Sequence, residues 1–190
     1  MANRTGEHYD STTIGLHWVT ALMVVILWGG AQVADFVPKG VWRTNGWTLH
    51  VALGFALATV LIWRIIWRFT GRRRLPAADS NDVIHMVAEA SHYVLYALLF
   101  LTVAFGVADA FARGFSLIDL SSMPVFGDKE ARTVLAMRHG FVADLLIAVA
   151  FIHAAAALAH HYLLKDGVLA RMTPEPHPAL EEHQLESSDA

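Results

Sequence analysis

The 190-residue chain contains no cysteine. Without a thiol it forms no disulfide, and it offers no thiolate to zinc, to an iron–sulfur cluster or to a covalently attached c-type haem. Charged residues are also scarce, at 16%, whereas 55% of the residues are hydrophobic. Soluble domains are charged at roughly a quarter of their positions, so this balance favours a polytopic membrane protein. The few basic residues mostly flank apolar segments, which gives no support to nucleic-acid binding.

Long apolar runs are what the chain does have. Four of them reach the length of about 20 residues that a membrane-spanning helix needs. They predict an all-α fold, an integral membrane four-helix bundle, with spans at residues 14–37, 47–69, 83–111 and 134–164. The first link is expected to be a short turn at Pro38 and Gly40. The third link, residues 113–132, is apolar enough to predict a short interfacial segment.

The distribution of Lys and Arg predicts how the chain lies in the membrane. With four spans, eight basic residues fall on the side of both termini and six on the other side. The densest group, between Arg64 and Arg74, lies at the end of the second run. Because cytoplasmic flanks carry the excess of basic residues, both termini are predicted to be cytoplasmic. Residues 1–173 would form the membrane domain, and the acidic, proline-rich residues 174–190 are expected to be a disordered tail.

Histidines inside these runs point to a bound group, because histidine in hydrocarbon is rarely kept without a polar or metal partner. His139 and His153 are 14 residues apart in the fourth run. On a helix they return to within about 40° of the same face and lie roughly 21 Å apart. One ring therefore falls near each side of a membrane about 30 Å thick. In the predicted orientation His17 has the depth of His153, and His50 has the depth of His139.

Each depth-matched pair comes from two different helices, as axial ligands on the two faces of a haem require. An iron held by two imidazoles has no free position, so it passes electrons rather than binding dioxygen. A lone membrane histidine could instead hydrogen-bond across a helix interface, but four matched by depth favour a metal. Di-iron bundles use several inward carboxylates, and the interior of the runs has almost none. The prediction is two haem b groups, with iron ligands His17, His50, His139 and His153.

Other polar residues on the cytoplasmic side have more than one possible role. His92 is deep enough to touch the cytoplasmic haem, and it is the strongest rival to the ligands assigned there. A position beside the haem rather than on its iron is favoured for it. His160 and His161 lie at headgroup level, where quinone, a haem propionate or solvent could contact them. Arg64 and Arg68 are their neighbours in depth, and a guanidinium suits carboxylates.

The motifs around the four assigned histidines resemble the bacterial cytochrome b561 family. They read IGLHW at His17, TLHVALG at His50, MRHGF at His139 and HAAAALAHHYLLKDGVLARM from His153. The resemblance covers about residues 8–173. It implies four spans, cytoplasmic termini and two b haems with bis-histidine ligation, and it carries the family's ligands onto the same four positions.

The segment HAAAALAHHY, followed by KDG and LARM, is similar to the superoxide oxidase branch of that family. This resemblance implies an enzyme of the bacterial inner membrane that oxidises periplasmic superoxide and reduces ubiquinone. The alternative is an electron-transfer subunit that passes electrons between a periplasmic redox protein and the quinone pool. Acidic and basic residues nearly balance on the outer side, so charge does not decide for an anionic substrate. The expected partners are lipid, quinone, and superoxide or a redox protein, with no nucleic acid.

Overall fold

The computed structural model describes residues 9–34, 36–70, 82–115, 127–165 and 169–173, without the side chains of residues 82–85. Within these ranges the chain is all-α. Its long helices are α1 (Ser11–Ala34), α2 (Val41–Thr70), α3 (Asp82–Ala112) and α4 (Lys129–Ala159). A π-helical turn, η1 (His160–Leu164), continues α4, and a 3-10 turn, η2 (Ala170–Met172), follows. The expected interfacial segment and the C-terminal tail lie outside the described residues.

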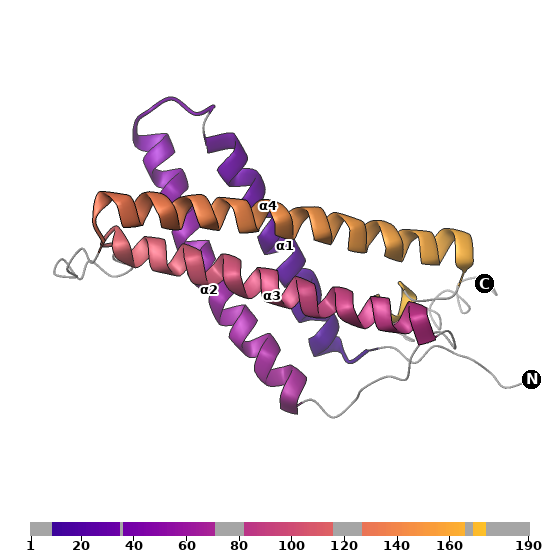
Figure 1. The fold of residues 1–190 in the computed structure, drawn as a ribbon. Helices are drawn as coiled ribbons and strands as arrows, with labels where there is room; N and C mark the ends of the chain where they lie inside the picture. Colours follow the sequence, from indigo (N-terminus) through magenta and orange to yellow (C-terminus); the bar gives the residue numbers. More distant parts are fainter. Residues whose placement is uncertain (1–8, 35, 71–81, 116–126, 166–168, 174–190) are drawn as a thin grey trace, which may run out of the picture.

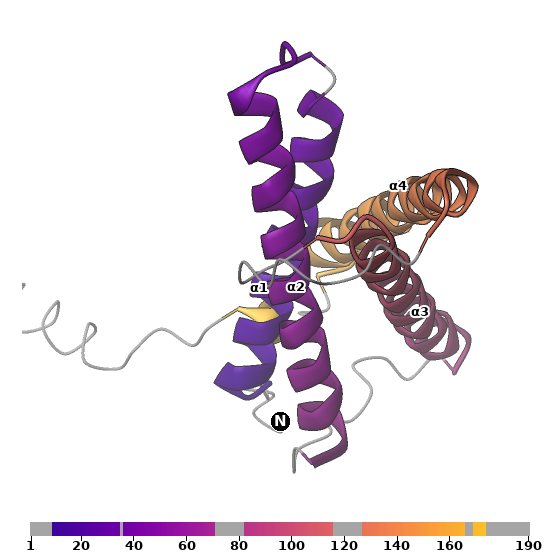
Figure 2. The same ribbon diagram turned by 90° about the vertical axis from the view of Figure 1, so that its left-hand side faces the viewer.

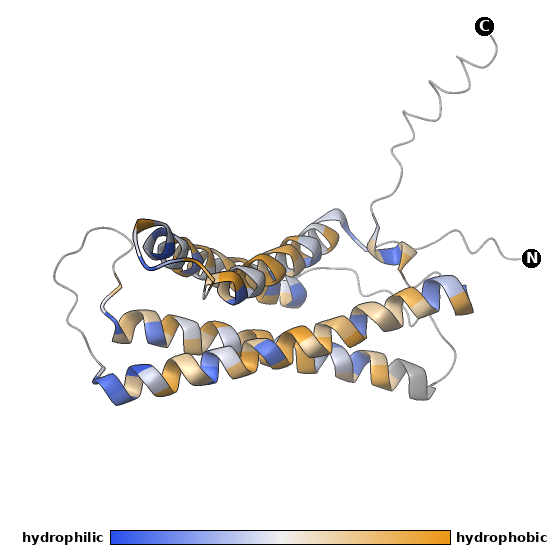
Figure 3. Cartoon of the chain, turned by 90° about the horizontal axis from the view of Figure 1, so that it is seen from above, coloured by the Kyte–Doolittle hydropathy of each residue, from blue (hydrophilic) through white to orange (hydrophobic). Residues whose placement is uncertain are grey.

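Each of the four long helices is long and apolar enough to cross a membrane, which confirms four candidate spans. Hydrophobic positions predominate along all four (Figure 3). The fourth span runs over Lys129–Leu164, 36 residues. At 1.5 Å per residue that is about 54 Å, well beyond a hydrocarbon core of about 30 Å. The ends of this span therefore project past the hydrocarbon.

The helices form two hairpins, α1 with α2 and α3 with α4 (Figure 1). Most contacts lie within each hairpin, and smaller contacts join α2 to α3 and α1 to α4. The hairpins cross one another rather than running side by side, as the turned view shows (Figure 2). We call the end with the α1–α2 turn and the α3–α4 link the turn end, and the opposite end, near both chain termini, the termini end.

All four helices begin earlier than their apolar runs predicted, and the difference is largest for α2 and α4. Asp128 caps α4, because its Oδ1 accepts a hydrogen bond of 2.7 Å from the amide of Ala131. A carboxylate at this position stabilises a helix start by about 1 kcal/mol, so α4 begins at Lys129. α2 begins at Val41, directly after Gly40, whose φ of 153° favours glycine. The first link is thus a tighter turn than expected.

A leucine core joins the two hairpins at their crossing. The buried members come from three helices and are Leu57, Leu61, Leu99 and Leu146. Three of them lie midway between two polar or site residues seven positions away, in the series His50–Leu57–Arg64, His92–Leu99–Gly106 and His139–Leu146–His153. Seven residues are about two turns, or about 10.5 Å. The leucines therefore form an apolar layer between two layers that carry the histidines.

Candidate functional site

The histidines gather in two places, one on each side of the leucine layer. The turn-end site consists of His50 and His139, with Thr102 and Gly106 of α3 beside them. The termini-end site consists of His17, His92, His153 and Arg64. All four histidines assigned as ligands from the sequence fall in these two sites, and the rival His92 falls in the second.

At the turn end, the rings of His50 and His139 lie next to each other in a T-shaped arrangement. Their centroids are 6.2 Å apart and their planes are perpendicular, at 90°. A metal held between two imidazoles, with bonds of about 2 Å and ring centres about 1 Å further out, separates the centroids by about 6 Å. The pair therefore has the spacing of two axial ligands before any adjustment.

The orientation of His139 is set by α3. Its Nδ1 lies 2.9 Å from the carbonyl oxygen of Thr102. A carbonyl only accepts hydrogen bonds, so Nδ1 carries the proton and donates it, which leaves the lone pair on Nε2. Metal-ligating histidines are commonly held in this way, with the second ring nitrogen donating to a backbone carbonyl. Gly106 makes room for the ring, because a Cβ there would lie 2.9 Å from Cε1 of His139.

At the termini end, three imidazoles lie within one cluster. The rings of His92 and His153 are 5.2 Å apart between centroids, with an interplanar angle of 67°. Arg64 reaches the cluster from α2, and its Nη2 lies 3.2 Å from Nδ1 of His17. Its Nε donates a hydrogen bond of 2.9 Å to the hydroxyl of Tyr96. The structure thus brings His92 into ring contact with a proposed ligand.

The contact of Arg64 fixes the proton of His17. A guanidinium has no acceptor, so Nδ1 of His17 accepts and the ring proton sits on Nε2. A histidine that binds iron through Nε2 needs the opposite tautomer. Binding of a metal by His17 through this nitrogen therefore requires that the contact with Arg64 is given up. The donor set fits a ligand pair at this end, but it is less preorganised than the turn-end pair.

Two arginines lie against tyrosines beside this cluster. The guanidinium of Arg64 is 5.1 Å from the ring centroid of Tyr96, and that of Arg68 is 5.5 Å from the same ring. Arg68 also lies 5.9 Å from the ring of Tyr93. Such contacts stabilise a cation on an aromatic face but leave guanidinium N–H groups available to an acceptor. The sequence indicated both arginines, whereas the tyrosines were missed because aromatic residues are common in spans.

The two remaining predicted residues, His160 and His161, lie in η1, where the last turns of α4 widen into a π-helix. The ring of His161 contacts that of Tyr162, with centroids 4.8 Å apart. Lys165 ends the turn in the left-handed conformation, at φ 53°. π-Helical turns within α-helices are frequent at functional sites.

The chain after η1 returns to the start of α1. The indole Nε1 of Trp18 donates to the carbonyl of Met172 at 2.9 Å, and the amide of Tyr9 donates to the carbonyl of Arg171 at 3.2 Å. The LARM motif therefore packs beside α1. Its contact there is Trp18, the residue that directly follows His17.

Asp10 ties the beginning of α1 to the end of α2. Its carboxylate accepts from the amide and the hydroxyl of Thr13, at 2.9 and 2.6 Å, and from the indole of Trp67, at 3.2 Å. Partial burial acts to raise the pKa of Asp10, but these hydrogen bonds outweigh it, so the pKa lies below its ordinary value. Asp10 is therefore a charged cap at the membrane boundary.

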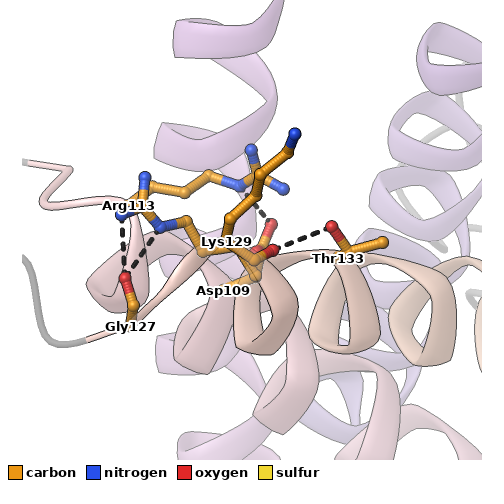
Figure 4. A network of polar contacts seen from close by, with 6 residues as sticks. Asp109, Arg113, Gly127, Lys129 and Thr133 are labelled. Carbon is orange, nitrogen blue, oxygen red and sulfur yellow. Dashed lines mark hydrogen bonds and ion pairs between the residues drawn. The ribbon is translucent and has the colours of Figure 1, made fainter.

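A polar network closes the turn end of the α3–α4 hairpin (Figure 4). Nε of Arg113 donates to Oδ2 of Asp109 at 2.8 Å. Nε and Nη2 of Arg132 donate to the carbonyl of Gly127 at 3.0 and 2.8 Å. Oδ1 of Asp109 is buried without a hydrogen-bond partner. Asp109 balances the charge of Arg113, whereas Arg132 binds a neutral carbonyl and keeps its positive charge at the turn end.

Sequence reasoning missed one further residue, Asp144, a carboxylate inside the fourth span. Its Oδ1 accepts from the indole of Trp28 at 2.8 Å and from the amide of Gln32 at 3.3 Å. The signal was present, because an ionisable residue within a span is by itself an indication of function.

The donor chemistry suits a ligand that brings its own equatorial donors. Among the described residues, no three His, Asp or Glu side chains converge as they would around a free metal ion. Two opposed imidazoles instead supply the axial ligands of a porphyrin iron. The residues of the turn-end site therefore fit a haem, and those of the termini-end site fit one once His17 is released from Arg64.

Known proteins are similar to this chain over most of its length. A probable superoxide oxidase, CybB, of Yersinia pestis is 28% identical over 174 residues, which are 89% of this chain and 97% of that protein. Cytochrome b561 homolog 2 of Escherichia coli (strain K12) is 26% identical over 173 residues, 88% and 92% of the two chains. Cytochrome b562 of Cereibacter sphaeroides is 29% identical over 169 residues, 86% and 94% of the two chains.

A family model described as prokaryotic cytochrome b561 matches residues 8–175, close to the range expected from the motifs. Together with the four candidate spans, this match identifies a multi-pass membrane protein of electron transfer. The chain belongs to the prokaryotic cytochrome b561 family.

Proposed function

We propose that this protein is a superoxide oxidase, which takes electrons from superoxide on the periplasmic side and delivers them to ubiquinone. The observation that carries the proposal is the similarity to a probable superoxide oxidase along 97% of that protein's length. The balanced reaction oxidises two superoxide anions to two molecules of dioxygen. The two electrons released, with two protons, reduce one ubiquinone to ubiquinol.

Two haem b groups are proposed, one at each site. A b haem supplies reversible one-electron transfer when it is bound. His50 and His139 are the proposed ligands at the turn end, supported by their 6.2 Å ring separation and by the donation from His139 to Thr102. His17 and His153 are the proposed ligands at the termini end. His92, in ring contact with His153, is the residue whose replacement tests that choice.

The termini-end site is proposed to face the cytoplasm and to receive the quinone. Arg64 and Arg68 have guanidinium groups stacked on tyrosine rings, so their N–H groups can donate to a quinone carbonyl or to a carboxylate. His160 and His161, in the π-helical turn below His153, are proposed to lie at the water boundary and to pass protons to the quinone. Cytoplasmic termini complete this proposed arrangement.

The test is rapid mixing of the purified haem-loaded protein with superoxide. After mixing, we expect the absorbance spectrum to change from that of oxidised haem b to that of reduced haem b. Added ubiquinone should restore the oxidised spectrum. Superoxide dismutase added beforehand is the control, and it should abolish the reduction.

A protein that stays oxidised under a flux of superoxide would contradict the proposed activity. Reduction by a co-purifying periplasmic redox protein would then favour the alternative, an electron-transfer subunit. A preparation without b-type absorbance would contradict both functions.

A further inference from the structure

Asp144 places a carboxylate inside the fourth span, where a charge is costly unless it is paired. Both of its hydrogen bonds come from neutral donors of α1, the indole of Trp28 and the amide of Gln32, and both reach the same oxygen, Oδ1. Oδ2 has no hydrogen bond among the described residues. The side chain is exposed on the outside of the helices. This carboxylate therefore has one oxygen fixed by the protein and one available to a proton.

Among the described residues, no ion pair joins this carboxylate to a cation. α1 contains no Lys, Arg, Asp or Glu. On α4 the nearest charged residue is Arg138, six positions earlier, and the next one in the other direction is Lys165. α3 carries Glu89 and Asp109 on either side of the leucine layer. α2 carries Arg43 near the turn end and Arg64 and Arg68 at the termini end. The titratable groups nearest along the helices are the site histidines: His17, His50, His139 and His153.

The position of Asp144 along α4 relates it to one of the two sites. It lies five residues after His139 and nine before His153. At 1.5 Å per residue these intervals are about 7.5 Å and about 13.5 Å. Coulomb interactions strengthen as distance and dielectric constant fall, so a charge change at the turn-end site acts on Asp144 more strongly than one at the termini end.

Gln32 connects this carboxylate with the turn end of α1. Gln32, which donates to it, is exposed and lies two residues before the end of α1 at Ala34. Trp28 lies one turn deeper on the same helix and fixes the other side of the contact. The Gln32 side therefore offers a short path for a proton between the turn-end solution and Oδ2.

We propose that Asp144 is a proton-binding site coupled to electron transfer, which takes up one proton from the turn-end solution when the turn-end haem site gains an electron. The added electron makes the surroundings more negative, and a bound proton compensates that charge. The O–H bond forms at Oδ2, and the proton returns to solution when the electron moves on. The inference rests on the haem ligation by His50 and His139 proposed above.

The experiment is a potentiometric titration of the purified haem-loaded protein at a series of pH values. In the wild-type protein the midpoint potential of the turn-end haem should fall as pH rises, because reduction takes up a proton. Asp144→Asn keeps an acceptor oxygen for Trp28 but binds no proton, so its midpoint potential should not change with pH. Asp109→Asn is the matched control, since it removes another carboxylate on the turn-end side of the leucine layer, and it should behave as the wild type.

Equal pH dependence in Asp144→Asn and the wild type would overturn the proposal, and so would loss of the dependence in Asp109→Asn. If Asp144→Asn does not assemble, infrared difference spectra of the wild-type protein decide. Reduction should then produce the C=O band of a protonated carboxyl group, sensitive to deuterium exchange, and its absence would overturn the proposal. Failure of the ligand assignment is distinguishable, because His139→Ala would then keep both haems.

Discussion

The ring of His139 rests directly on the backbone of α3 at Gly106. A Cβ at this glycine would lie 2.9 Å from Cε1 and 3.0 Å from Nδ1 of the imidazole. The same nitrogen donates to the carbonyl of Thr102, four residues earlier on α3. One helix therefore supplies both the hydrogen bond and the space that orient this histidine.

Gly106→Ala should displace the His139 ring and weaken the turn-end haem site. Alanine in place of glycine normally stabilises a helix by about 1 kcal/mol, so a loss here reverses the usual sign. The measurement is haem content per protein together with thermal unfolding in detergent. Gly46→Ala on α2 is the control, since a Cβ there meets no atom within 4 Å, and it should be neutral or stabilising. Equal behaviour of the two variants would contradict the contact.

His50→Ala and His139→Ala should each remove the same haem, and the double variant should remove no further haem. The reason is that one ligand pair serves one iron, so the two losses are not additive. Haem is counted from the pyridine haemochrome spectrum per protein. His153→Ala should remove the other haem. A double variant that loses both haems would show that the two rings belong to different sites.

Arg64→Met should lower the midpoint potential of the termini-end haem. A nearby positive charge favours the reduced, less positive iron, and its removal favours the oxidised form. One tenfold change in the one-electron equilibrium corresponds to about 60 mV, which sets the expected size. Arg113→Met is the matched control, because Arg113 pairs with Asp109 at the opposite end of α3. A potential that stays constant or rises in Arg64→Met would exclude this electrostatic role.

Asp10→Asn should destabilise the protein at neutral pH but not at strongly acidic pH. The pKa of Asp10 in the fold lies below its ordinary value of 3.8, so its charge stabilises the fold above about pH 4. That stabilisation is lost as pH falls through the lowered pKa. Because the carboxylate is partly exposed, the effect is expected to be a few tenths of a kcal/mol. Thermal unfolding of both proteins between neutral and acidic pH measures it, and a difference that grows on acidification would contradict it.

His160→Ala and His161→Ala, made singly, should slow ubiquinone reduction without loss of haem. Both residues lie in the π-helical turn beyond His153, where a proton donor would meet the quinone. A slowing of roughly 100-fold is typical for removal of a group that transfers protons. Steady-state quinone reduction and the haem spectrum are measured together. Unchanged rates in both variants would move the quinone site elsewhere.

Hydropathy and histidine spacing predicted most of the features that depend on a single helix. The number of spans and the two levels of His139 and His153 follow from run length and from rise per residue. The start of α4 was placed too late, although Asp128 was a visible capping signal. Apolar composition fades at helix ends, so it marks the hydrocarbon rather than the helix.

Relationships between helices could not be predicted from the sequence in the same way. The crossing of the two hairpins depends on side-chain packing at the leucine core, and nothing in the four runs indicates it. The contact of Arg64 with His17 joins residues 47 positions apart. The contact of His139 with Gly106 needed the register of α3 against α4, which hydropathy does not give.

The leucine layer lies between the two histidine levels, so an electron that passes between the two proposed haem sites would cross part of the membrane voltage. The interval from His139 to His153 is about 21 Å, or roughly two thirds of a hydrocarbon core of about 30 Å. A full crossing changes the energy of one charge by about 2.3 kcal/mol per 100 mV, so this passage corresponds to about 1.5 kcal/mol. The membrane potential would therefore add this energy to, or subtract it from, the free energy of electron transfer between the turn end and the termini end. The interval between His139 and His153, with Leu146 at its midpoint, would set the size of this voltage dependence.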